Sequence, residues 1–175
     1  DKILVTGTLG DHGITIMSCR EELGFSADLQ TDAAPLNHLI QEVIAAAPNT
    51  RCFRDPTRGG LASTLNELAE QSQVDFVIEE DAIPVKDAVR GACEMLGYDI
   101  FQVANEGKMV CVVAGDEAEA ALEAMKANKY GVDAAIIGEV VEKPEGRDSR
   151  VSLRTGFGSL RIMDMLVGEQ LPRIC

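Results

Sequence analysis

Hydrophobic residues recur along the chain in two spacings, and this alternation predicts a succession of strands and helices. Short β-rich runs indicate strands, and longer runs with apolar residues three and four positions apart indicate helices. The expected strands are 3–6, 50–54, 74–78, 108–114, 134–141, 150–154 and 159–162. The expected helices are 14–23, 36–47, 61–71, 85–96, 116–128 and a final helical turn at 162–167. The most apolar strand, 108–114, is expected at the centre of the sheet.

The elements alternate without a Pro/Ser-rich linker, an internal repeat or a low-complexity tract. We therefore expect one domain over residues 1–167, followed by a mobile tail, 168–175. Two strand runs near the end predict a closing hairpin. This hairpin favours an α+β fold, with a mixed sheet and helices packed on it, over a doubly wound parallel sheet. Because the chain opens on Asp1 and enters a strand at once, we expect it to be a piece of a larger protein.

The composition and charge of the chain argue against several classes of function. The chain has 175 residues, 46% of them hydrophobic, and a net charge of −13. This charge argues against a nucleic-acid surface and against binding to anionic membranes. The sequence shows no 18-residue apolar run and no signal peptide. The five cysteines are odd in number and form no C-x-x-C pair, which argues against a disulfide framework or a zinc site and favours the cytoplasm.

The segment 55–60 is the strongest internal motif. Its sequence is Asp-Pro-Thr-Arg-Gly-Gly, and it connects a predicted strand to a predicted helix. Backbone N–H groups at a helix N-terminus attract anions, and Arg and Thr side chains add donors for phosphate. The candidate anion-binding residues are Asp55, Thr57, Arg58, Gly59 and Gly60. Asp55 could instead hold Mg²⁺ or cap the helix, and an ordinary capping turn is the alternative for the whole segment.

The glycine-rich turn 7–13 is a second candidate anion site, because it also follows a strand and precedes a helix. Its candidate residues are Gly10, His12 and Gly13. The spacing is not that of the dinucleotide fingerprint, so an ordinary strand-to-helix turn remains the alternative. Of the two histidines, His12 is better placed for chemistry. The segment 31–38 is interpreted as a capped helix start.

The segment 105–108, Asn-Glu-Gly-Lys, places a carboxylate and an amine on either side of a glycine. Glu106 is a candidate general base if burial raises its pKa. Lys108 could pair with Glu106 or with a phosphate. The alternative is a solvated turn.

The chain ends on Cys175, and a thiol on a terminal segment can move between sites and act as a nucleophile. Pro172 stiffens the segment before it, and Arg173 favours the thiolate. The alternative is that Cys175 is an inert chain end. The other four cysteines are expected in or near the core. They are Cys19, Cys52, Cys93 and Cys111.

The segments 55–60 and 105–108 and the ending 172–175, Pro-Arg-Ile-Cys, together resemble the HypE family of hydrogenase maturation factors. The wider relatives are the aminoimidazole ribonucleotide synthetase and selenophosphate synthetase superfamily. The glycine-rich segments are shared across the superfamily, whereas the terminal Pro-Arg-Ile-Cys is the specific part. The resemblance covers only the C-terminal part of such a protein. It implies an additional N-terminal domain that supplies much of the ATP site and a homodimer interface.

The resemblance also implies a reaction. Cys175 receives a carbamoyl group from the carbamoyltransferase HypF, and ATP with Mg²⁺ drives its dehydration to a thiocyanate. The cyano group then passes to iron on a HypC–HypD scaffold, as a ligand of the [NiFe] hydrogenase centre. In this scheme Cys175, Glu106 and Lys108 are the catalytic residues. The segment 55–60 would then be the anion cradle.

Two other functions remain open. The chain could be a binding module that only presents its tail to partners without turning over ATP, and a nucleotide titration would distinguish this from the enzyme. It could also be a small-molecule phosphotransferase like the purine members of the superfamily. Such an enzyme needs no terminal cysteine, so activity that survives removal of Cys175 would favour it.

Overall fold

The computed structural model describes residues 1–20 and 29–165, so the predicted tail and Cys175 lie outside the described residues. The strands are β1 Lys2–Val5, β2 Thr50–Arg54, β3 Asp75–Glu79, β4 Val110–Val113, β5 Ala135–Val141, β6 Val151–Arg154 and β7 Leu160–Ile162. The helices are α1 Asp11–Arg20, α2 Asn37–Ala46, α3 Gly60–Ser72, α4 Asp87–Leu96 and α5 Ala118–Ala127. None of these helices in the described part of the chain is both long and apolar enough to cross a lipid bilayer.

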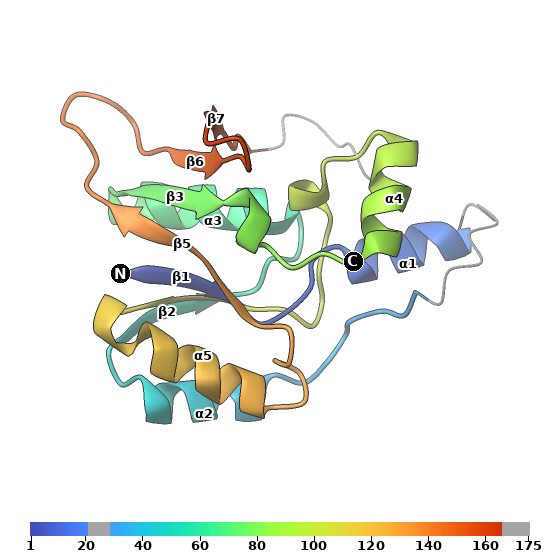
Figure 1. Ribbon diagram of the computed structural model, residues 1–175, viewed down its shortest axis with the longest axis horizontal. Coiled ribbons are helices and arrows are strands. Elements are labelled where there is room, and N and C mark those ends of the chain that lie inside the picture. The colour runs from blue at the N-terminus through green and yellow to red at the C-terminus, as the bar shows by residue number, and fades with distance from the viewer. Residues whose placement is uncertain (21–28, 166–175) are drawn as a thin grey trace.

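The strands form one sheet in the order β2-β4-β1-β5-β3-β6-β7 (Figure 1). β3 and β6 pair in parallel, and the other neighbouring strands pair antiparallel. The closing hairpin forms between β6 and β7, with Ser152 opposite Ile162. The prediction of an α+β fold with a mixed sheet is therefore confirmed.

The prediction that 108–114 lies at the centre of the sheet is wrong. The strand β4 is second from the edge, between β2 and β1. Its residues are all buried because helices cover both faces of the sheet at this strand. Val110 and Val112 face the core under α3, while Cys111 and Val113 face the core under α2 and α5.

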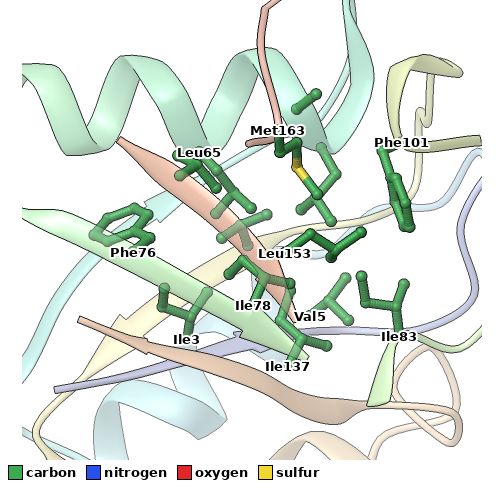
Figure 2. Close-up of a cluster of buried hydrophobic side chains, with 14 of the residues drawn as sticks. Ile3, Val5, Leu65, Phe76, Ile78, Ile83, Phe101, Ile137, Leu153 and Met163 are labelled. Atoms are coloured by element: carbon green, nitrogen blue, oxygen red, sulfur yellow. The ribbon is translucent and has the colours of Figure 1, made fainter. Parts of the chain in front are cut away.

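The two faces of the sheet carry separate cores, as the alternation within each strand requires. On one face, Ile3 and Val5 of β1 pack with Leu61 and Leu65 of α3; Figure 2 labels Ile3, Val5 and Leu65 in this cluster. On the other face, Leu4 packs under α2 and α5, which lie side by side in Figure 1. A third cluster joins α1 to α4 beyond the end of the sheet. These packed layers hold the strand-to-helix turns at one end of the sheet.

Three predictions about helices differ from the structure by more than a residue or two at an end. The first helix begins at Asp11, inside the predicted glycine-rich turn. Asp116 does not cap the helix after β4, because it lies in a short 3₁₀ turn and Glu117 precedes α5 without a side-chain cap. The final helical turn is also wrong in its described part. Ile162 ends β7, and residues 163–165 are not helical.

A partly buried ion pair between Asp75 and Arg147 connects the loop between β5 and β6 to β3. Asp75 is 7% exposed, accepts hydrogen bonds from both Nη atoms of Arg147, and accepts one from Arg150 N at 2.9 Å. Burial alone would raise the pKa of the Asp75 carboxyl. The hydrogen bonds from Arg147 and Arg150 outweigh burial and hold this pKa below its usual value.

Asp75→Asn is expected to lower the free energy of unfolding by about 2 kcal/mol at pH 7, because Arg147 loses its counter-ion. A carboxyl with a lowered pKa stabilises the fold above its unfolded pKa, and this contribution disappears as the pH falls through the folded value. The difference between wild type and variant should therefore shrink below about pH 4 in urea unfolding curves. The exposed pair of Glu79 and Arg154 supplies the control. Glu79→Gln should cost no more than about 0.5 kcal/mol, and an equal loss in both variants would contradict the prediction.

Candidate functional site

The Asn105 side chain joins three segments that are far apart in the sequence. Asn105 is 1% exposed. Its Oδ1 accepts from Gly10 N at 2.8 Å, and its Nδ2 donates to the carbonyl oxygens of Pro56 and Val103, both at 3.0 Å. The predicted segments 7–13, 55–60 and 105–108 therefore converge on one buried amide, at the end of the sheet where β1, β2 and β4 meet their loops.

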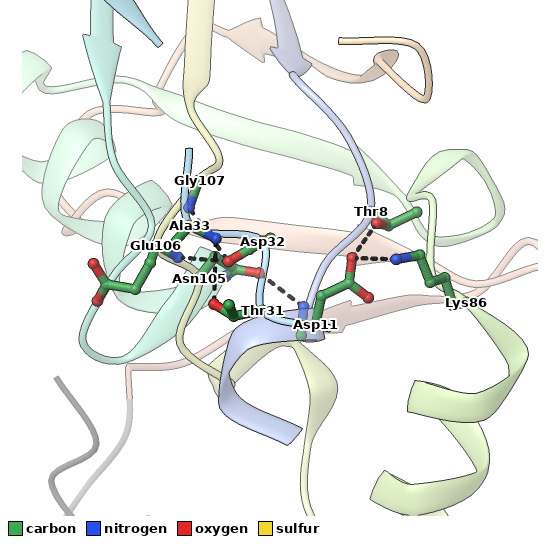
Figure 3. Close-up of polar contacts among 10 residues, drawn as sticks. Thr8, Asp11, Thr31, Asp32, Ala33, Lys86, Asn105, Glu106 and Gly107 are labelled. Carbon is green, nitrogen blue, oxygen red and sulfur yellow. Dashed lines mark hydrogen bonds and ion pairs between the residues drawn. The ribbon is translucent and has the colours of Figure 1, made fainter. Parts of the chain in front are cut away.

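Asp32 holds the turn that carries Glu106. Its Oδ1 accepts from Glu106 N at 3.0 Å and from Gly107 N at 3.3 Å (Figure 3). A Cβ atom on Gly107 would lie 1.6 Å from the Asp32 carbonyl oxygen, so only glycine fits this approach. The interpretation of 31–38 as a capped helix start is wrong, because α2 is preceded by Leu36 without a side-chain cap. Asp32 instead positions the 105–108 turn.

The segment 55–60 ends in two glycines with left-handed backbone angles, at φ +74° for Gly59 and φ +59° for Gly60. Gly59 precedes α3, and this helix N-terminus has no side-chain cap. Asp55 therefore does not act as a cap; it is exposed and lies 3.8 Å from Arg54 Nε. Arg58 is exposed and Thr57 is partly buried. The role of this uncapped helix start, with Arg and Thr beside it, as an anion cradle remains a prediction.

Gly60→Ala is expected to destabilise the chain by about 3 kcal/mol. Alanine would need a left-handed backbone conformation, and its Cβ would lie 2.6 Å from Phe101 O and 2.7 Å from Val103 O. Gly91→Ala is the matched control, because Gly91 lies in α4 and a Cβ atom there would have no described atom within 4 Å outside its own helix backbone. It should be neutral or stabilise by up to about 1 kcal/mol. Thermal unfolding of both variants measures the contrast, and equal melting temperatures would contradict it.

A second polar network lies at the start of α1. Asp11 is 1% exposed. Its Oδ2 accepts from Thr8 Oγ1 at 2.5 Å and lies 2.9 Å from Lys86 Nζ (Figure 3). His12, one residue further, is also buried, and its Nδ1 lies 2.8 Å from Thr31 Oγ1. Its role as an anion ligand remains a prediction, as do those of Gly10 and Gly13. Gly10 N is engaged by Asn105, and Gly13 N donates to Ala104 O.

A cavity of about 280 Å³ opens beside these loops. Lys108 lies on its wall, next to Gly7, while Glu106 is not among its lining residues. In Figure 3 the Glu106 carboxylate points away from the pair of Asp11 and Lys86. Glu106 and Lys108 therefore lie on one turn but face different surroundings. Among the described residues, no group of three or more His, Cys, Asp or Glu side chains could hold a metal ion.

The described cysteines do not offer a reactive thiolate in the core. Burial raises the pKa of Cys93 to about 11 and that of Cys111 to about 12, and it also raises the pKa of Cys52. These thiols are protonated at neutral pH. The prediction that Cys19 belongs to the core is wrong, because its side chain is exposed on α1.

Three members of this polar cluster, Asp11, Asp32 and Lys86, are absent from the predicted site residues, and only Asp11 lies in a segment, 7–13, that was predicted as a site. The sequence does contain one signal for Asp11, since it lies between Gly10 and Gly13 at a helix start. Lys86 is distant from Asp11 along the chain, so only the fold brings the two together.

Comparisons with known proteins identify relatives of this chain. A family model for the C-terminal domain of AIR synthase related proteins matches residues 1–149. The carbamoyl dehydratase HypE of Azotobacter vinelandii is 53% identical over all 175 residues. A crystal structure of the hydrogenase maturation protein HypE in complex with ATP superposes with a TM-score of 0.93 at 44% identity, over 99% of this chain and 52% of that one. A HypE–HypF complex gives 0.88 at 45% identity, over 94% and 52%.

The chain spans about half the length of these relatives, with 50% of the Azotobacter protein covered. The matched family model covers most of the chain and carries the assignment. The resemblance to HypE seen in the segments 55–60 and 105–108 agrees with it. The chain therefore belongs to the family of AIR synthase related proteins, through their C-terminal domain.

Proposed function

We propose that this chain is part of a hydrogenase maturation enzyme that dehydrates a carbamoyl group on the thiol of Cys175 to a thiocyanate, at the expense of ATP. The observation that carries the proposal is 53% identity over the whole chain to a protein named carbamoyl dehydratase HypE. The convergence of the segments 55–60 and 105–108 on Asn105 supports it, because it brings the predicted anion cradle beside the predicted base.

The proposed reaction balances as follows. The carbonyl oxygen of the S-carbamoyl group attacks the terminal phosphate of ATP, and ADP leaves. Two N–H protons are lost from the nitrogen, and the C–O bond breaks as inorganic phosphate departs. A C≡N group remains on sulfur. The chain must therefore supply a proton acceptor, an anion site and a carrier thiol.

Each role has a candidate in this chain. Glu106 is the proposed base and Lys108 the proposed partner of the phosphate. The uncapped start of α3, with Thr57, Arg58, Gly59 and Gly60, would hold phosphate oxygens. Asp55 would supply one oxygen ligand to a Mg²⁺ ion bound with the nucleotide, and the remaining ligands would come from the phosphates and from parts of the protein beyond this chain.

The named complexes suggest the partners. Because one solved relative is a HypE–HypF complex, we propose HypF as the carbamoyl donor. Transfer of the cyano group to iron on a HypC–HypD scaffold, homodimer formation through a further domain and a cytoplasmic location complete the proposal. Because the chain covers about half of its relatives, we propose that it does not turn over ATP alone.

Intact-mass analysis of the C-terminal peptide tests the proposed function. After incubation of the complete protein with the carbamoyl donor system, Cys175 should gain one carbamoyl group, and with ATP it should then lose one water. Cys19 is the internal control, since its thiol is exposed and should stay unmodified. An unchanged mass at Cys175, or equal modification of Cys19, would exclude the proposed function.

A further inference from the structure

The turn that carries Glu106 is fixed at both of its ends by hydrogen bonds. On one side, Asn105 N donates to Pro56 O at 3.1 Å, and the Asn105 side chain makes the buried contacts described above. On the other side, Met109 N donates to Thr6 Oγ1 at 2.9 Å, and Thr6 N donates to Met109 O at 3.0 Å. Both ends are therefore held without any contribution from the side chain that holds the tip of the turn.

The tip of the turn depends on Asp32. Asp32 Oδ1 accepts from Glu106 N and Gly107 N, the two amides on either side of the Glu106 Cα atom. Because each peptide unit is planar, fixing both units sets the direction of the Cα–Cβ bond of Glu106. The other carboxylate oxygen of Asp32 has no hydrogen-bond partner among the described residues. All hydrogen bonds of this carboxylate within the described chain therefore go to the tip.

The short segment around Asp32 is anchored to α1. Thr31 Oγ1 lies 2.8 Å from His12 Nδ1 in the first turn of α1, and it accepts from Ala33 N at 3.3 Å (Figure 3). The backbone of this segment also contacts the tip, since a Cβ atom on Gly107 would lie 1.6 Å from Asp32 O. The segment therefore connects the start of α1 to the residue that precedes and the residue that follows the Glu106 Cα–Cβ bond.

We propose that Asp32 is a positioning residue for the dehydration, because it directs the Glu106 carboxylate toward the proton that this base removes. The inference rests on the proposed function, in which Glu106 is the base. A reacting group that is displaced by about 1 Å can lose about 10²-fold in rate, since proton transfer requires hydrogen-bond distance. The segment 55–60 is bonded to Asn105 and not to Asp32, so nucleotide binding there should be independent of Asp32.

Asp32→Ala is expected to slow the loss of water from carbamoylated Cys175 by about 10–100-fold, at saturating ATP in the complete protein. The KM for ATP should stay within about twofold, because the lost contact is not one that binds substrate. Asp32→Asn keeps an oxygen that can accept from both N–H groups, so its rate should stay within about threefold of wild type. Asp116→Ala, exposed beyond the far end of β4, is the control and should react at the normal rate.

A double-mutant cycle separates positioning from a loss of folded protein. If Asp32 acts through Glu106, Asp32→Ala should slow the reaction by less than about threefold when it is added to Glu106→Gln. A loss of folded protein would instead slow the reaction equally in both backgrounds. Hydrogen–deuterium exchange supplies a second measurement. The amides of residues 106 and 107 should exchange about tenfold faster in Asp32→Ala but not in Asp32→Asn, because only alanine removes their acceptor.

Thr31→Val provides a second variant if Asp32→Ala does not fold. It removes the hydroxyl that contacts His12 and Ala33, but it leaves the Asp32 carboxylate in the chain. We expect the rate to fall by about 3–10-fold, as the loss of one or two neutral hydrogen bonds allows. This loss should also disappear when Thr31→Val is added to Glu106→Gln.

Three results would overturn the positioning role. These are a wild-type rate in Asp32→Ala, an undiminished effect of Asp32→Ala in the Glu106→Gln background, and a rate in Asp32→Asn as low as that in Asp32→Ala. Failure of the proposed function is a separate result. In that case the carbamoylated wild-type protein would lose no water at all, and the positioning role would be removed with it.

Discussion

Asn105→Asp is expected to lower the free energy of unfolding by about 3 kcal/mol at pH 7. The amide donates to two carbonyl oxygens, those of Pro56 and Val103, and it is 1% exposed. Aspartate loses both donors and places a buried negative charge against these oxygens. The loss should shrink as the pH is lowered, because a protonated carboxyl can donate to one carbonyl. Urea unfolding at pH 7 and pH 5 measures both effects.

The same variant should also disturb the loops that Asn105 joins. The amide signals of Gly10 and of the segment 55–60 should shift or broaden in NMR spectra, since both are bonded to this side chain. Asn128→Asp is the matched control. Asn128 donates to Glu42 in an exposed contact and accepts from Tyr130 N in a partly buried one, and the change should cost less than about 1 kcal/mol. If both variants lost the same stability, Asn105 would not be the link between the loops.

The links that Asn105 makes could not be predicted from local patterns. The segments 7–13, 55–60 and 105–108 are recognisable because each has a local signal, namely glycine and polar residues between a strand and a helix. The bond from Gly10 to Asn105 spans 95 positions, and no local pattern reports it. Asp32 and Lys86 were missed for the same reason, because their partners come from distant segments.

The fold could be predicted from the sequence more completely than the contacts of the candidate site. The strand 50–54 was predicted with its observed bounds, and the hairpin of β6 and β7 set the fold class correctly. Both depend on alternation and turn residues, which are local properties. The position of β4 was predicted wrongly. A strand whose residues are all buried has both faces of the sheet covered at that point, but this burial does not show how far the strand lies from the sheet edge.

Glu106→Gln is expected to slow the proposed dehydration by about 10²–10⁴-fold, the usual contribution of a general base. Glutamine keeps the shape of the side chain but cannot accept a proton. The turn should remain in place, because Asp32 holds it through the backbone N–H groups of Glu106 and Gly107. The measurement is the rate at which carbamoylated Cys175 loses one water in the complete protein with ATP.

The position of Glu106 allows the Glu106→Gln variant to test the proposed base separately from the nearby cavity. Glu106 does not line the cavity that contains Asp11 and Lys108, so Glu106→Gln should leave the walls of that cavity unchanged. Glu123→Gln, exposed on α5, is the control for loss of one carboxylate and should react at the normal rate. A normal rate in Glu106→Gln would remove Glu106 as the base.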